Sequence, residues 1–235
     1  MPTKPVQRIS AWSFSRWSTY ATCPAKAKYS ILDRIKEPSN KAMERGSAIH
    51  ELAEHYVQGK MTKLPDELKL FKKEFELLKK SKPQSELSAT FKQDWTQTTW
   101  DDWTGAWVRV KIDVLVPPSK AGVMHVNDYK TGRPKTEGYK EQLELYAIAG
   151  FLLYPQATEA RTNLWFLDHG KISGADAEHN PTNEGVFQRK ELPKLIKVWE
   201  RRVEPMLSDT RFAPKPGPYC TWCYFSKNKA GPCRF

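Results

Sequence analysis

Three charged residues on two predicted β-strands have the types and spacing to cleave a phosphodiester. Asp113 comes near the end of one strand, and Asp128 and Lys130 follow on the next strand. Two carboxylates can hold a divalent cation that polarises a phosphate and generates hydroxide, and a lysine beside them can stabilise charge or orient the water. The plain alternative is a solvated strand face that carries ordinary charges.

Hydrophobic alternation predicts the strands that position these residues. The apolar face of the first strand carries Val108, Val110, Ile112, Val114 and Val116. Its other face carries Arg109, Lys111 and Asp113. Because side chains two residues apart on a strand share a face, Asp128 and Lys130 should project from the same side of the second strand.

Further motifs surround this acid pair in a fixed order. Gly46 and His50 lie four residues apart in a helical stretch before it, and Gln142 and Tyr146 lie four apart in a helical stretch after it. Together with the segment 13–24 and a C-terminal cysteine cluster, this order resembles the RecB-like branch of the PD-(D/E)XK nuclease superfamily. That branch carries a four-cysteine iron–sulfur cluster and includes exonucleases of CRISPR adaptation and of phages. The resemblance extends from about residue 10 to the end of the chain.

The resemblance implies a role for each motif residue. The implied ligands of a Mg²⁺ or Mn²⁺ site are His50, Asp113, Asp128 and the backbone carbonyl of Tyr129. Lys130 would aid the attacking water, and Gln142 and Tyr146 would face the site and contact the phosphate or the water. Without the resemblance, a lone helical histidine is more often packed or solvated, and this glutamine and tyrosine could be surface and core. Glu86 stands where some relatives use an acid, and we leave it out of the predicted set.

The four cysteines predict a second metal centre. They are Cys23, Cys220, Cys223 and Cys233. A Cys-x-x-Cys turn points two thiolates at one centre, whereas disulfides are disfavoured in the inferred cytosol. Zinc and an iron–sulfur cluster both accept four thiolates. One cysteine before the core and three after it resembles the [4Fe–4S] relatives, but the long spacing before the last cysteine leaves zinc as the alternative.

Composition favours a polyanionic partner. The chain has 235 residues, with 38 lysines and arginines against 27 aspartates and glutamates and a net charge of +11. Such an excess indicates nucleic acid first. A membrane surface is the competing partner, but we expect none because no segment approaches the roughly 18 consecutive apolar residues of a spanning helix. No signal peptide is evident, so we expect a cytoplasmic protein.

Periodicity predicts a single α/β domain over residues 1–235, with a central mixed sheet flanked by helices. Strands are expected near 86–93, 106–117, 123–130, 162–168 and 185–190. Helices are expected over 13–23, 41–59, 65–81, 137–151 and 191–207, and a polar connection over 170–184. The resemblance implies a restriction-endonuclease-like core at 86–207, after an N-terminal helical part at 12–81. The cysteine-rich tail at 208–235 would be joined to the N-terminal part by the four-cysteine centre.

Aromatic and basic residues outside the motifs suggest contacts with DNA. Four tryptophans cluster around a predicted β-turn: Trp95, Trp100, Trp103 and Trp107. Most tryptophans belong to cores, but an exposed subset could stack on unpaired bases. Arg16 lies near the expected substrate entrance, and Arg133 and Lys135 follow Lys130 in a loop that could bind phosphate or be merely polar.

These observations predict a Mg²⁺- or Mn²⁺-dependent deoxyribonuclease, an exonuclease acting on DNA with single-stranded character or free ends. Recombination or repair, phage DNA processing and CRISPR adaptation are the candidate settings. Because no Walker-type phosphate loop is present, a helicase would be a separate partner, as would a recombinase or integrase. One alternative is a catalytically inactive, metal-stapled subunit that binds nucleic acid. The other is a structural zinc protein whose strand acids are surface charges.

Overall fold

The protein is described by a computed structural model that covers residues 7–134 and 139–235. The chain forms two compact units, which we call the terminal unit (residues 1–39 and 198–235) and the central unit (residues 40–197). All candidate residues of the acid–lysine site belong to the central unit, and all four cysteines belong to the terminal unit. The predicted single domain over 1–235 stays a prediction.

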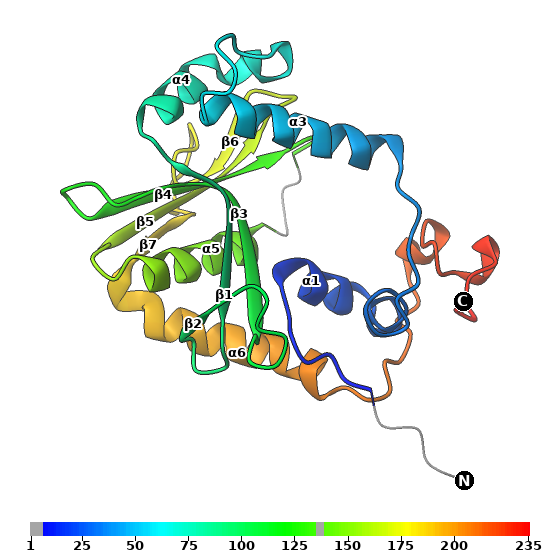
Figure 1. The fold of residues 1–235 in the computed structure, drawn as a ribbon. Coiled ribbons are helices and arrows are strands. Elements are labelled where there is room, and N and C mark those ends of the chain that lie inside the picture. The colour runs from blue at the N-terminus through cyan, green and yellow to red at the C-terminus, as the bar shows by residue number, and fades with distance from the viewer. Residues whose placement is uncertain (1–6, 135–138) are drawn as a thin grey trace. The chain divides into compact units, whose positions relative to one another are not determined.

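The central unit is built on one twisted sheet whose strand order is β2-β1-β3-β4-β5-β6, with β7 also paired to β5 (Figure 1). The strands are β1 (Gln84–Phe91), β2 (Gln97–Thr98), β3 (Val108–Val116), β4 (Val123–Lys130), β5 (Glu159–Phe166), β6 (Lys171–Gly174) and β7 (Val186–Gln188). Strands β4 and β5 are parallel, whereas the other pairs are antiparallel. This mixed sheet agrees with the predicted α/β class.

The alternation predicted for β3 is confirmed. Its apolar face is buried from Val108 to Val114, whereas Lys111 is exposed and Arg109 and Asp113 are half-buried. Strand β3 pairs with β4 only from Val114 to Val116. The two strands therefore part at the residues that the sequence singled out.

Helices cover both faces of the sheet (Figure 1). Helix α3 (Lys41–Val57), the 3₁₀ turn at Asp66–Phe71 and α4 (Lys72–Lys80) form one layer. Their shared core includes Ile49, Phe71, Phe75, Tyr129 and Trp165. Helix α5 (Lys140–Leu153) packs on the opposite face, with apolar contacts that include Met124, Phe151, Leu143, Leu164 and Phe166. Asn40 starts α3 because its side chain accepts the Met43 N–H at 3.0 Å.

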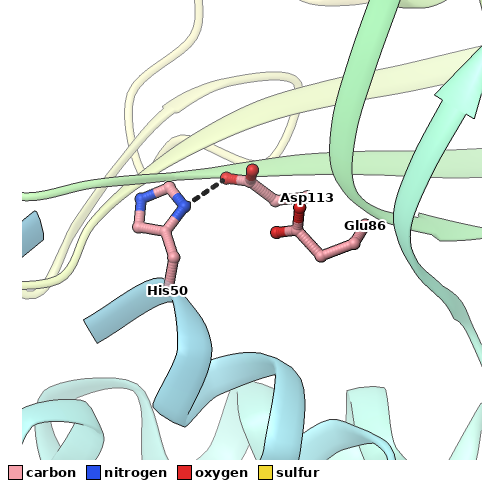
Figure 2. A group of neighbouring side chains, drawn as sticks. All are labelled: His50, Glu86 and Asp113. Atoms are coloured by element: carbon pink, nitrogen blue, oxygen red, sulfur yellow. Dashed lines mark ion pairs between the residues drawn. The ribbon is translucent and has the colours of Figure 1, made fainter. Parts of the chain in front are cut away.

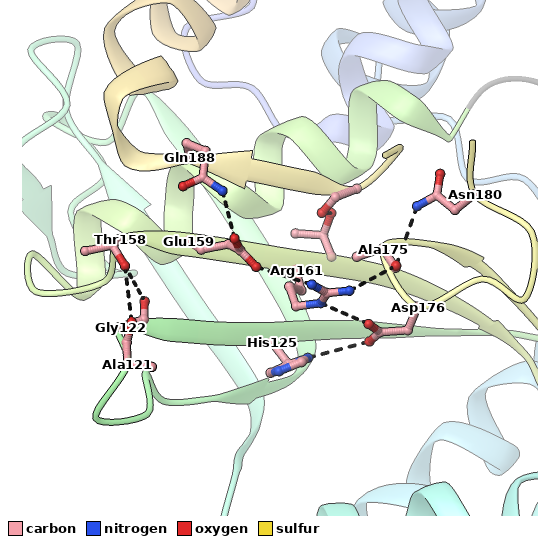
Figure 3. Close-up of polar contacts among 12 residues, drawn as sticks. Ala121, Gly122, His125, Thr158, Glu159, Arg161, Ala175, Asp176, Asn180 and Gln188 are labelled. Carbon is pink, nitrogen blue, oxygen red and sulfur yellow. Dashed lines mark hydrogen bonds and ion pairs between the residues drawn. The ribbon is translucent and has the colours of Figure 1, made fainter. Parts of the chain in front are cut away.

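The segment predicted as a polar connection at 170–184 is partly wrong, because it contains strand β6. Residues 176–184 are mostly exposed and irregular, as predicted, but some of their polar groups hydrogen-bond to neighbouring strands (Figure 3). Asp176 accepts from Arg161 Nε at 3.0 Å and from Asn163 Nδ2 at 2.7 Å, and it pairs with His125 Nδ1 at 3.5 Å. The network fixes the chain after β6 to strands β4 and β5.

The terminal unit contains α1 (Phe14–Thr22), α2 (Pro24–Ala27), a π-helical turn at Lys28–Leu32 and the part of α6 (Leu192–Ser208) that follows residue 197. Short 3₁₀ turns at Pro218–Thr221 and Lys227–Lys229 complete it. Its core is aromatic: the rings of Trp12 and Trp199 stack with centroids 5.1 Å apart. In the described part of the chain, no helix has the length and apolarity needed to span a membrane.

Candidate active site

The site begins where β3 and β4 separate. Val114 and Asn127 are the last paired residues, so Asp113 and Asp128 are the first residues beyond the ladder on the two strands. The gap is bridged by a side chain, because Asp113 Oδ2 accepts the backbone N–H of Tyr129 at 2.6 Å. A charge-assisted hydrogen bond of this kind fixes the orientation of the carboxylate.

Three side chains from three elements converge beside this gap. His50 comes from α3, Glu86 from β1 and Asp113 from β3, and their donor atoms all lie within 4.8 Å of one another (Figure 2). His50 Nδ1 is 3.4 Å from Asp113 Oδ2. In the described part of the chain, these three side chains form a group whose ligand atoms are close enough to hold one metal ion.

A glycine brings α3 close to the strand ends. A Cβ at Gly46 would stand 3.1 Å from the Thr131 hydroxyl, a very close contact, so a glycine suits this position. Gly46 and His50 share a helix face because they are four residues apart. The helix is further anchored by Arg45, which forms a bidentate pair with Asp168 at 2.6 and 2.9 Å. The spacing of glycine and histidine thus has a geometric reason.

The electrostatics of the converging group fit a divalent cation. Burial raises the pKa of the Glu86 carboxyl, and the charge of Asp113 adds to the rise while Lys111 opposes it. Burial alone would lower the pKa of His50, but its hydrogen bond to Asp113 and the Asp113 charge outweigh this effect and the pKa is raised. Mutual repulsion of carboxylates is relieved by a bound cation. Two carboxylates suit Mg²⁺ or Mn²⁺, and the imidazole favours the transition metal.

Asp128 lies in a neighbouring buried cluster. Its Oδ1 accepts the Tyr146 hydroxyl and the Gln142 amide, the latter at 3.2 Å, and its Oδ2 pairs with the Lys130 ammonium. Burial raises the pKa of Asp128, and the Asp113 charge acts in the same direction while Lys130 opposes it. Burial and the charge of Asp128 raise the pKa of Tyr146 well above its ordinary value, so the hydroxyl keeps its proton and donates.

The structure therefore brings together the predicted residues Asp128, Lys130, Gln142 and Tyr146. Both Asp128 oxygens are engaged within this cluster, and Asp128 is not in the converging group of His50, Glu86 and Asp113. Its predicted role as a metal ligand, like that of the Tyr129 carbonyl, stays a prediction.

Glu86 is the site residue that we had left out of the predicted set. It lies on β1 between Ser85, which pairs with Val114, and Leu87, which pairs with Ile112, and so stands across from Asp113. The signals in the sequence are its place at the start of a strand and the acid that some relatives of the resembled family use there. These signals could not be used without the register of β1 on β3, which local patterns do not determine.

The predicted basic contacts have different surroundings. Arg16 is exposed in the terminal unit and donates from Nη1 to the Ala11 carbonyl at 2.8 Å. Arg133 is exposed in the central unit, shortly after Lys130. Lys135 lies outside the described residues.

The four cysteines are free thiols with intermediate exposure. Cys23 Sγ accepts the Lys215 N–H and Cys220 Sγ accepts the Gly217 N–H, each at 3.4 Å. Both Cys233 and Cys23 contribute to raising the pKa of the Tyr29 hydroxyl, after burial as the main cause. Among the described residues, the cysteines do not form a group close enough to hold a single ion.

A sheet that opens between two carboxylates, with a lysine beside one and a histidine beside the other, offers ligands for a cation and a positive charge for a phosphate. The sequence profile of the PD-(D/E)XK nuclease superfamily matches residues 11–227. The chain therefore belongs to the PD-(D/E)XK nuclease superfamily.

Solved structures similar to this chain are distant in sequence. A protein from Eubacterium rectale described as a putative exonuclease is 12% identical, with a TM-score of 0.52, and the match covers 94% of this chain and 87% of that one. A protein called SSO0001 is 13% identical with a TM-score of 0.47, covering 98% of this chain and 90% of that one. No curated protein sequence matches the chain significantly.

Proposed function

We propose that the protein is a Mg²⁺- or Mn²⁺-dependent DNA exonuclease. The observation that carries this proposal is the convergence of His50, Glu86 and Asp113, within 4.8 Å of one another, in a member of a nuclease superfamily. Separately, Lys130 is paired with the buried Asp128 in the same unit. The net charge of +11 favours nucleic acid as the substrate.

The proposed roles follow from the contacts of each side chain. His50, Glu86 and Asp113 would hold the cation, with Asp128 as a further ligand if its contacts rearrange. A bound divalent cation would supply Lewis-acid stabilisation of the phosphate charge and an acidified water. Lys130 would stabilise negative charge on the phosphate or orient the water, and its pairing with Asp128 keeps the ammonium in place.

Gln142 and Tyr146 hold this arrangement from α5. The Gln142 amide donates to Asp128 and to the Tyr146 hydroxyl, at 3.2 and 2.6 Å. This network fixes the acid whose other oxygen binds Lys130, so both residues would orient the lysine in addition to any contact with substrate.

The exonuclease assignment is supported by the description of the Eubacterium rectale protein, whose similarity to this chain is one of fold. We propose DNA with free ends or single-stranded character as the substrate. Recombination or repair, phage DNA processing and CRISPR adaptation are the proposed settings, with a helicase, recombinase or integrase as a separate partner.

Digestion of linear and circular DNA tests the proposal. Linear single- and double-stranded DNA, covalently closed duplex circles and single-stranded circles are incubated with the protein, with and without Mg²⁺ or Mn²⁺. We expect linear DNA to be degraded only with the cation, and circles to be spared. Cutting of circles at the same rate would show an endonuclease, and binding without cleavage under any cation would favour the inactive binding subunit.

We further propose that Cys23, Cys220, Cys223 and Cys233 hold a [4Fe–4S] cluster, with zinc as the alternative. The proposal is supported by the backbone N–H groups of Lys215 and Gly217, which donate to two of the sulfurs, because such bonds stabilise thiolate ligands. A cluster also holds its sulfurs farther apart than a single ion does.

Metal analysis of anaerobically purified protein separates the two centres. We expect a brown protein that contains iron and acid-labile sulfide. Colourless protein with one equivalent of zinc would overturn the cluster, and stable protein without either metal would overturn both centres.

A further inference from the structure

Two tryptophans of the loop between β2 and β3 lie beside two cations of strand β3. The Arg109 guanidinium lies over the Trp103 ring at 5.1 Å from its centroid and over the Trp100 ring at 5.7 Å. Its Nε and Nη2 donate to the Trp100 carbonyl at 3.3 and 3.2 Å. The Lys111 ammonium is 6.0 Å from the same Trp100 ring. We call Trp100, Trp103, Arg109 and Lys111 the aromatic platform.

Trp103 remains 78% exposed despite the contact with Arg109. A large ring that stays in water forgoes the free energy of burial, so an exposed tryptophan indicates a binding surface when other features agree.

The loop that presents Trp103 is held in one conformation by Asp102. One Asp102 oxygen accepts the Thr98 hydroxyl at 2.7 Å, and the other accepts the Gly105 N–H at 2.7 Å. These bonds lower the pKa of Asp102. A ring held in advance loses little conformational entropy when a ligand stacks on it. The Asp102 charge is directed into the loop, and Asp101 is the other acid beside Trp103 in the loop.

The platform is aligned with the candidate active site. Arg109, Lys111 and Asp113 alternate along β3 and share one face. At about 3.4 Å per residue, Lys111 stands about 7 Å and Arg109 about 14 Å from Asp113 along the strand. A stacked nucleic acid strand advances about 3.4 Å per nucleotide, so this distance spans no more than about four nucleotides. The register sets the exposed Ser88 opposite Lys111.

We propose that this strand face is a track for single-stranded DNA, on which a base stacks on Trp103 while Arg109 and Lys111 bind the phosphates that lead to Asp113. The inference rests on the proposed nuclease function and assigns its substrate as an unpaired strand. An unpaired base can turn its ring face to a protein aromatic side chain, whereas bases inside a duplex stack on one another. Two cations between the exposed ring and the acids complement a phosphodiester backbone.

Fluorescence anisotropy with labelled oligo(dT), without added divalent cation, tests the platform. We expect Trp103→Ala to weaken binding of oligo(dT) about tenfold, within the range known for loss of one base–aromatic stack. Binding of a covalently closed duplex circle, which has no end, should change less than about twofold, because its bases stack on one another. Trp103→Phe should restore most of the affinity. Leu77→Ala is the matched control, since Leu77 is an exposed apolar residue on α4.

The cations are tested by the salt dependence of the same binding. Lys111→Gln should reduce the slope of log affinity against log salt by about one, as expected for loss of one phosphate contact. Lys73→Gln, an exposed lysine on α4, is the matched control and should leave the slope unchanged. Equal loss of oligo(dT) and duplex binding in Trp103→Ala, or no loss of either, would overturn the proposal.

Cleavage separates failure of this inference from failure of the proposed nuclease. In cleavage measured over a range of single-stranded DNA concentrations, Trp103→Ala should raise KM and leave kcat unchanged. If the wild-type protein does not cleave DNA, but Trp103→Ala weakens oligo(dT) binding, the nuclease proposal is refuted and the track is retained. If the wild-type protein cleaves DNA and Trp103→Ala leaves KM unchanged, the track is refuted and the nuclease proposal is retained.

Discussion

Glu86 adopts a left-handed backbone conformation, with φ at 49°, in the first part of a β-strand. A residue other than glycine in this region carries strain of about 1–3 kcal/mol. Strain at a residue that also converges with His50 and Asp113 fits a side chain positioned for function at some cost to stability. Burial and the Asp113 charge raise the pKa of the same carboxyl, which is a second cost that a cation would offset.

Glu86→Gly should therefore separate stability from metal binding. We expect the free energy of unfolding without metal to rise by up to about 1 kcal/mol, because glycine tolerates the backbone conformation. Mn²⁺ affinity measured by calorimetry should fall at least about tenfold, because a ligand is lost. Glu51→Gln on the exposed face of α3 is the control. Unchanged Mn²⁺ affinity in Glu86→Gly would remove Glu86 from the site.

Tyr146 is the buried donor that holds Asp128. Tyr146→Phe should lower the free energy of unfolding by about 1–3 kcal/mol, because the buried carboxylate loses a hydrogen bond. Tyr154→Phe is the matched control, since burial alone raises the pKa of Tyr154 and no acid contributes. Urea denaturation measures both variants. Equal effects of the two substitutions would mean that the Tyr146 hydroxyl does not support Asp128.

Strands β4 and β5 form a parallel pair, and β4 carries Asp128 and Lys130. A separate polar network fixes the segment after β6 to these two strands (Figure 3). In this network the hydrogen bond from His125 is the main cause that lowers the pKa of Asp176 to about 2, and Arg161 and Asn163 also lower it while burial opposes them. The network attaches Asp176, in the segment whose polarity predicts a loop, to strands β4 and β5. It lies outside the candidate active site, so it reports on the stability of the sheet.

The stability that Asp176 contributes should depend on pH in a defined direction. Its pKa is lower in the folded protein than in the unfolded chain, so its contribution is complete above the unfolded value near 3.9 and is lost as pH falls toward about 2. The difference in unfolding free energy between the protein and Asp176→Asn should therefore shrink between about pH 4 and pH 2. Urea denaturation at both values measures it. A difference that stays constant across this range would contradict the assignment.

Two properties belong to the whole molecule: its excess of positive charge, and the terminal unit, which both ends of the chain form. Its net charge is +11, and its cysteines come from residue 23 and from the last part of the chain, within the terminal unit. A metal centre at these cysteines would close a very long loop of chain and so contribute its binding energy to folding.

DNA affinity should fall steeply with salt if the positive charge binds phosphates. Between about 50 mM and about 200 mM salt, a protein that neutralises even about two phosphates loses about tenfold in affinity. Fluorescence anisotropy across this range measures the slope. An affinity that stays flat would point to a partner other than nucleic acid.

The sequence predicts much of this arrangement because its signals are local. Alternation along β3 and β4 locates Asp113, Asp128 and Lys130, and the four-residue spacing of Gly46 and His50 reflects one helix face. What local patterns do not determine is the pairing between elements. The position of Glu86 depends on the register of β1 on β3, and β6 is held by contacts with residues far along the chain.

Cleavage by Asp113→Asn and Lys130→Met, compared with DNA binding by the same proteins, tests the proposed site most directly. Single-turnover digestion of end-labelled single-stranded DNA in Mn²⁺ gives the rate, and anisotropy without added cation gives the affinity. We predict that either substitution abolishes cleavage while DNA binding changes little, and that Glu178→Gln, an exposed acid outside the site, cleaves normally. Cleavage near the wild-type rate in Asp113→Asn or Lys130→Met would contradict the proposed active site.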